Sequence, residues 1–244
     1  NNIMKLIIIL FIFILIIYVL GKKRVAFEGF ENEDINEETN AKLSFPVYWI
    51  NLDRSKDRKK FMLKQFKKYN ITNHTRISAV DGSKLDDNFS SLNTMCLDEK
   101  QKQKFIKLLK KRNIKPEVGA TFSHLFAAKK SYINGNEYAI IIEDDIDFKY
   151  MDKWDFNLSE LVNEANKEIP NWEVLQLHIS GKDAIQNLLS NKNRFVSWQP
   201  WMASAGMYVI NRKGMSYFNS LLNSCNEFLK LDKNNLVADE VMFN

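Results

Sequence analysis

Residues 138–147, YAIIIEDDID, place a short apolar run directly before a cluster of acids. The run at 139–142 is brief and rich in isoleucine, which is typical of a strand buried on both faces of a sheet. The acids at or just beyond its carboxyl end are Glu143, Asp144, Asp145 and Asp147. Ligands of open α/β sheets bind at the carboxyl ends of the strands. The segment therefore favours an α/β fold and marks a candidate ligand site.

Crowded carboxylates repel one another unless a cation or a basic partner lies among them. Oxygen ligands of this kind suit Mn²⁺ or Mg²⁺. Alternation along an extended chain directs Glu143 and Asp145 to one side and Asp144 to the other. We therefore expect Glu143 and Asp145 around a nucleotide-type ligand and its metal ion, with Asp145 as the direct metal ligand. Asp144 is a further donor-site candidate, and Asp147 a further candidate metal ligand. A solvated acidic loop after the strand is the alternative.

Strand-like and helix-like segments alternate along the rest of the chain. Strands are predicted at 47–50, 76–80, 138–142, 173–179 and 207–210. Apolar residues at helical spacing predict helices after Ser55, at 121–134, at 158–168 and after residue 210. This alternation indicates an α/β domain with a mainly parallel central sheet.

The first 42 residues differ from the rest of the chain. Residues 3–20 are apolar except for Lys5, which is close to the minimum length of a membrane span and predicts an uncleaved single-pass anchor. The side of the membrane stays open, because basic residues lie on both flanks. Residues 21–42 include an acidic stretch and read as a charged, flexible stalk. One domain is expected at 43–244.

The net charge of +5 is concentrated in one segment. Residues 99–115 hold eight basic residues and one acid, with apolar residues at helical spacing, so an amphipathic basic helix is predicted. This helix either presents a charged face to solvent or contacts anionic lipid or an acidic acceptor. Nucleic-acid binding is not expected, because aromatic residues are not interleaved with the basic ones as a stacking surface requires.

Further candidates lie near other element ends. Asp53 and Arg54 follow the strand at 47–50, and Arg58 lies one turn into the next predicted helix. The planar fork of an arginine suits a diphosphate. These residues could equally form surface ion pairs. His124, placed near a helix start, could contact a phosphate or serve a structural role. Asp239 and Glu240 could act as metal ligand or as general base, or simply begin a helix.

In their order and residues, these pieces resemble glycosyltransferase family 25, which includes lipopolysaccharide sugar transferases and collagen galactosyltransferases. The segments that carry the resemblance are VYWINLDRSKDR (47–58), ISAVDG (77–82), PEVGATFSHLFAAKKS (116–131), YAIIIEDDIDF (138–148), NWEVLQLH (171–178), SAGMYVINRKG (204–214) and VADEVMF (237–243). They cover nearly all of 46–243. The N-L-D-R sequence after the first strand, the E-x-G-x-x-x-S-H element and the apolar run before E-D-D are each moderately specific, and all three in this order and at this spacing make the resemblance strong.

The resemblance implies a GT-A-like transferase with a DxD-like acidic motif at residues 143–145. It further implies transfer of a hexose, most often galactose from UDP-galactose with Mn²⁺, to a glycan or protein hydroxyl. Asp145 would then be the metal ligand, and Asp239 the favoured second acid. The donor-site candidates by position are Asn51, Asp53, Arg54, Asp81 and Gly82.

Three points stay open beside the resemblance. The chain stops four residues after Glu240, where the family leads us to expect further sequence. The alternative functions are a catalytically silent family member and a membrane-tethered adaptor that uses the basic helix at 99–115. The inverting or retaining outcome, the sugar and the acceptor are not determined by these residues.

Overall fold

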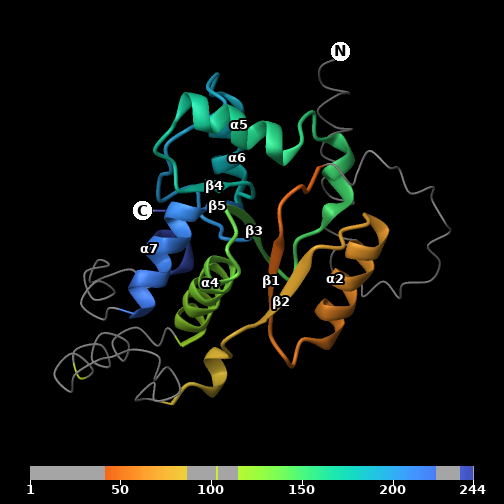
Figure 1. Ribbon diagram of the computed structural model, residues 1–244, viewed down its shortest axis with the longest axis vertical. Helices are drawn as coiled ribbons and strands as arrows, with labels where there is room; N and C mark the ends of the chain where they lie inside the picture. Colours follow the sequence, from red (N-terminus) through yellow and green to blue (C-terminus); the bar gives the residue numbers. More distant parts are fainter. Residues whose placement is uncertain (1–41, 87–102, 104–114, 224–236, 244) are drawn as a thin grey trace, which may run out of the picture. The chain divides into compact units, whose positions relative to one another are not determined.

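The computed structural model describes residues 42–86, 103, 115–223 and 237–243 (Figure 1). The predicted anchor at 3–20 lies outside these residues, as do the stalk at 21–42 apart from Lys42 and the basic helix at 99–115 apart from Gln103 and Lys115. The helices and strands of the described part are β1 (Val47–Asn51), α2 (Lys56–Lys68), β2 (His74–Ser78), η2 (Gly82–Lys84), α4 (Lys115–Ile133), β3 (Tyr138–Glu143), η4 (Phe148–Lys153), α5 (Leu158–Glu168), β4 (Val174–Gln176), α6 (Lys182–Leu189), β5 (Met207–Asn211), α7 (Arg212–Asn223) and α9 (Ala238–Phe243).

The described residues form a five-stranded sheet in the order β2-β1-β3-β5-β4. β1 pairs in parallel with β2 and β3, whereas β5 runs antiparallel to both β3 and β4. The predicted α/β class is confirmed, but the expectation of a mainly parallel sheet is wrong. The chain leaves β4 and enters β5 at the same edge of the sheet, so β5 returns beside β4 without a crossover.

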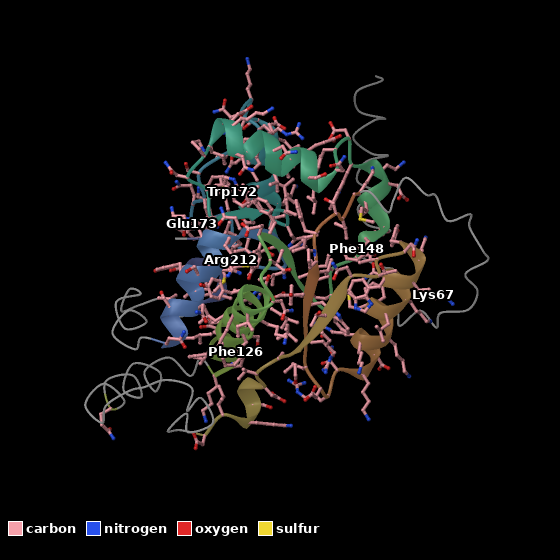
Figure 2. All side chains as sticks on the ribbon, viewed as in Figure 1. Lys67, Phe126, Phe148, Trp172, Glu173 and Arg212 are labelled. Atoms are coloured by element: carbon pink, nitrogen blue, oxygen red, sulfur yellow. The ribbon has the colours of Figure 1, made fainter. Side chains whose placement is uncertain are left out.

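Hydrophobic residues fill both faces of the sheet. One face packs against α4, α7 and α9, and the other packs against α2, η4 and α5. Alternate residues of one strand serve the two faces, so Tyr48 points to the first cluster and Trp49 to the second. Phe148, which is labelled in Figure 2, extends the second cluster. Its ring packs against those of Phe66 and Tyr69.

The central strand β3 confirms the interpretation of the apolar run. All four residues at 139–142 have no exposed surface, as expected of a strand covered on both faces. Its neighbours on either side are β1 and β5. The acids that follow β3 are therefore held at one edge of the sheet by the most deeply buried strand.

Helix α4 begins earlier than the sequence pattern indicated. The pattern predicted a start near residue 121, whereas the helix runs from Lys115 and includes Pro116 in its first turn. Proline is tolerated there because its missing N–H would have no partner within the helix. His124 consequently lies well inside the helix, away from the N-terminal N–H groups that attract anions.

The membrane localisation expected from the sequence needs correction. None of the helices in the described part of the chain is long and apolar enough to cross a membrane.

Candidate functional site

The candidate site lies at the edge where β1 and β3 end. These strands are parallel neighbours, and Ile50 near the end of β1 is paired with Glu143 at the end of β3. Parallel strands end at the same edge, so Asn51 meets the acids that follow β3. The same edge receives the start of β5, because Met207 is paired with Ile142.

Asn51 and Arg58 hold Asp144 from two sides. The buried Asn51 donates from Nδ2 to Oδ2 of Asp144 at 2.6 Å. Arg58 donates from Nη1 to Oδ1 of Asp144 at 2.9 Å. The Asp144 side chain is only 9% exposed, so both of its oxygens have protein partners in a largely buried position. Asp144 therefore ties β1, α2 and β3 together.

Asp145 shares Arg58 but lies in the open. Nη1 of Arg58 donates to Oδ2 of Asp145 at 3.0 Å, and the Asp145 side chain is 50% exposed. Hydrogen bonding to Asp144 is the main reason that the pKa of Arg58 is raised, with the charge of Asp145 adding to it. Of the two aspartates, Asp145 is the one that a ligand in solution can reach.

A second group of ion pairs lines the β2 side of the edge. Arg76 on β2 donates to Oδ1 of Asn51 at 2.9 Å and to Oδ1 of Asp53 at 2.7 Å. Arg54 donates to Oδ2 of Asp81 at 2.9 Å. The hydrogen bond from Arg76 is the main cause that lowers the pKa of Asp53. The candidate donor residues thus lie in one strip of hydrogen-bonded polar and charged side chains, which contains Asn51, Asp53, Arg54 and Asp81.

Gly82, the remaining donor-site candidate of this region, allows close packing beside this strip. It begins η2, and a Cβ at Gly82 would collide with the backbone of Lys115 and Pro116 at the start of α4. A Cβ at Gly119 would lie 2.6 Å from the carbonyl oxygen of Val80. The two glycines therefore let the turn after β2 lie directly on α4.

Glu143 faces a buried histidine. Its Oε1 lies 3.2 Å from Nε2 of His124, and Nδ1 of His124 lies 3.1 Å from the hydroxyl of Tyr208 on β5. His124 is 1% exposed, whereas the Glu143 side chain is 38% exposed. The hydrogen bond to His124 is the main reason that the pKa of Glu143 is lowered; the charges of His124, His178 and Arg58 act in the same direction.

Asp239 lies on α9, close enough to Glu143 for their charges to interact. Burial is the first cause that raises the pKa of Asp239, and the charge of Glu143 raises it further. Hydrogen bonds from the backbone N–H groups of Ala205 and Ser204 act against this rise. A carboxylate with a raised pKa beside other titratable groups is a candidate proton acceptor. Glu240 is the next residue of α9 and is half-buried.

Asp147 has local contacts. Its side chain caps η4 by accepting from the backbone N–H of Lys149 at 3.0 Å, and it forms an ion pair with Lys149 at 3.5 Å. Within the described residues, no group of three or more His, Cys, Asp or Glu side chains is arranged to hold a metal ion. The oxygen chemistry of Asp145 still suits a cation whose other ligands are phosphate oxygens and water, since one or two protein carboxylates suffice for such a site.

Sequence reasoning missed Arg76, Tyr208 and His178. Nδ1 of His178, just after β4, lies 2.7 Å from Oγ of Ser204, in the loop that leads into β5. A polar side chain inside an otherwise apolar strand is a usable signal for Tyr208, whereas Arg76 lies in a strand of mostly polar residues that gives no such signal. The position of His178 depends on strand order, for which a local pattern carries no signal.

The described part of the chain thus combines a mixed α/β sheet with a carboxyl edge rich in aspartate and arginine, which is the arrangement of a Rossmann-like transferase domain. The profile of glycosyltransferase family 25 (LPS biosynthesis protein) matches residues 45–242, and the chain belongs to this family. The resemblance seen in the sequence is confirmed, and the chain is a glycosyltransferase. A comparison with curated proteins gave no match.

Proposed function

We propose that this glycosyltransferase moves a hexose, with galactose as the first candidate, from a UDP-sugar to a hydroxyl of a glycan or protein acceptor, with the help of Mn²⁺ or Mg²⁺. The observation that carries the proposal is the half-exposed Asp145, which lies beside Arg58 at the carboxyl edge of the sheet. Ligands of α/β sheets bind at this edge. Membership of the family supports the reaction class.

The donor is proposed to bind on the side of β1 and β2. Arg54 and Arg58 are both more than half exposed, and each forms ion pairs through one nitrogen of its guanidinium group. Their other N–H groups can reach a diphosphate, which accepts the paired hydrogen bonds that arginine offers. Asp53 and Asp81 would then orient these arginines or contact the sugar and ribose hydroxyls.

The cation is proposed to bind at Asp145. Asp144 is less suited, because Asn51 and Arg58 already occupy its two oxygens. A divalent ion at this position would offset the charge that grows on the diphosphate as its bond to the sugar breaks. Asp147 remains a second predicted ligand, although its carboxylate caps η4.

The acceptor is proposed to approach from the side of α9. Asp239 would take the proton of the attacking hydroxyl while the new bond to the anomeric carbon forms and the bond to the diphosphate breaks. Its raised pKa suits this role, because a base with a proton affinity closer to the working pH accepts a proton more readily. Glu240 is the second candidate for the same step.

The test starts with the full chain. UDP-, GDP- and CMP-sugars are incubated with it, with and without Mn²⁺, and donor hydrolysis and donor binding are measured. We expect one UDP-hexose to be bound and slowly hydrolysed in a metal-dependent way. Asp145→Asn should abolish metal dependence and turnover, while the control Asp152→Asn, at an exposed position of η4, should leave both unchanged.

Three results would contradict the proposal. Full activity of Asp145→Asn would exclude the cation role of Asp145. Donor binding without turnover in a folded chain would instead favour a catalytically silent member of the family. A chain that binds no donor would favour the adaptor function, whose basic helix at 99–115 lies almost entirely outside the described residues.

A further inference from the structure

Tyr208, His124 and Glu143 form a connected row that runs from the core to the site. Tyr208 on β5 is fully buried, His124 on α4 is almost fully buried, and only Glu143 reaches the surface. The rings of His124 and Tyr208 stack with their centroids 5.7 Å apart. Both ring nitrogens of His124 are therefore engaged inside the protein, at 3.1 Å and 3.2 Å from their partners.

The direction of the hydrogen bonds follows from the charge of Glu143. An ionised carboxylate only accepts, so Nε2 of His124 must carry the proton that lies between them. In the neutral imidazole, Nδ1 is then an acceptor and takes the hydroxyl proton of Tyr208. Burial raises the pKa of Tyr208 well above its usual value, and the nearby Glu143 adds to this, so the hydroxyl keeps the proton it donates. The sulfur of Met242, 3.5 Å from the same hydroxyl, is only a weak alternative acceptor.

Charged and titratable groups surround Glu143 on several elements. His124 comes from α4, Tyr208 from β5, Arg58 from α2 and Asp239 from α9. His178, after β4, also acts on Glu143 through its charge, and Asp144 is the next residue in the chain. Only Asp239 among these partners combines a raised pKa with a place on the proposed acceptor side. The backbone N–H of Glu143 donates to the carbonyl oxygen of Gly206 at 2.9 Å, and the same loop supplies the N–H groups of Ser204 and Ala205 that bind Asp239, so one loop holds Glu143 and Asp239 at the site.

We propose that Tyr208 and His124 are positioning residues that fix the carboxylate of Glu143 at the edge of the site, beside the loop that holds Asp239. This inference rests on the proposed function. It assigns His124 a role inside the protein in place of the predicted contact with donor phosphate, since neither ring nitrogen points to solvent with a vacant hydrogen-bonding position.

Tyr208→Phe is the sharpest variant, because it removes one hydroxyl and leaves the ring. We expect kcat to fall about tenfold, the loss typical of one well-placed hydrogen bond, while KM for the donor stays within about twofold. Tyr48→Phe is the matched control. Tyr48 is also a buried strand tyrosine, and its hydroxyl accepts hydrogen bonds from Asn134 at 2.8 Å and Asn136 at 2.7 Å, near the amino end of β1. It should leave kcat unchanged.

Two further variants test the order of the row. His124→Gln keeps an amide N–H that can reach Glu143, so it should retain more activity than His124→Leu. Equal losses of activity in the two His124 variants, or an equal loss of kcat in Tyr48→Phe and Tyr208→Phe, would overturn the proposal.

Nitrogen-15 NMR of the His124 ring gives a readout that does not need turnover. We expect the tautomer with its proton on Nε2 in the full chain, and a change of this signal in Tyr208→Phe but not in Tyr48→Phe. A proton on Nδ1 of the neutral ring would overturn the proposed row even in an active enzyme. If no transfer is detected while the expected tautomer is found, the proposed function fails and the row itself stands.

Discussion

The two adjacent aspartates after β3 should lose very different amounts of stability on the same substitution. Asp144→Asn replaces one carboxylate oxygen by an NH₂ group, which must then face Nδ2 of Asn51 or Nη1 of Arg58, and both of these are donors. A hydrogen bond to a charged group contributes about 1.5–3 kcal/mol, and Asp144 cannot turn to water because it is 9% exposed. Water can still reach the 56% exposed Arg58, which moderates the loss. We expect a net loss of about 2–3 kcal/mol.

Asp145→Asn is the matched comparison, because it breaks an ion pair to the same nitrogen of Arg58. Both side chains of that pair are about half exposed, so the change should cost at most about 0.5 kcal/mol. Urea unfolding of the full chain measures the difference directly. In a thermal scan, Asp144→Asn should lower Tm by about 5–10 °C. A loss below about 1 kcal/mol for Asp144→Asn, or an equal loss for Asp145→Asn, would refute the proposed division between a structural and an accessible carboxylate.

Three further predictions concern the stability of the structure that surrounds the site. Gly119→Ala should destabilise the fold by about 2–3 kcal/mol in urea, because the new Cβ would lie 2.6 Å from the carbonyl oxygen of Val80; a neutral effect would contradict this close approach. The Ser83 hydroxyl, followed by Arg54, lowers the pKa of Asp81 from 3.8 to about 2, so the stability difference between wild type and Asp81→Asn should be constant above about pH 5 and shrink as the pH falls towards 2. A difference that grows with acidification would reverse the sign of this argument. Asn157→Ala should cost about 1 kcal/mol by removing the capping box of α5, and calorimetry showing no change would exclude that contribution.

Local patterns predicted the parts of the fold that are determined by residues close together in the sequence. The apolar run before Glu143 indicated the buried strand, and the acids beyond it indicated the edge where the site lies. Sequence patterns were less informative where one residue type is compatible with two different local structures. A proline can follow the end of one helix or lie in the first turn of the next, and Pro116 lies in the first turn of α4, which places His124 in the helix interior instead of at the expected helix start.

The order and direction of the strands could not be derived in the same way. Whether β5 runs parallel or antiparallel to β3 depends on contacts between residues far apart in the chain, and its sequence is apolar in either case. Tyr208 therefore could not be assigned to His124, nor Ser204 to His178, from the sequence alone. Arg58 was recognisable as a diphosphate candidate, but its bridge between Asp144 and Asp145 requires the β1–β3 register.

The reversed direction of β5 is what brings together the residues of the proposed acceptor side. Because β5 begins at the carboxyl edge of β3, the loop before it lies beside Glu143, whose backbone N–H donates to the carbonyl oxygen of Gly206 at 2.9 Å. The same loop supplies the N–H groups of Ser204 and Ala205 that bind Asp239. Ser204 has φ of +148°, a costly conformation for a residue with a side chain, and such strain persists only where the surroundings enforce it. A parallel β5 would begin at the opposite edge, and neither Asp239 nor His178 would then be held near Glu143. The departure from the parallel sheet is therefore the feature that joins the two proposed halves of the site.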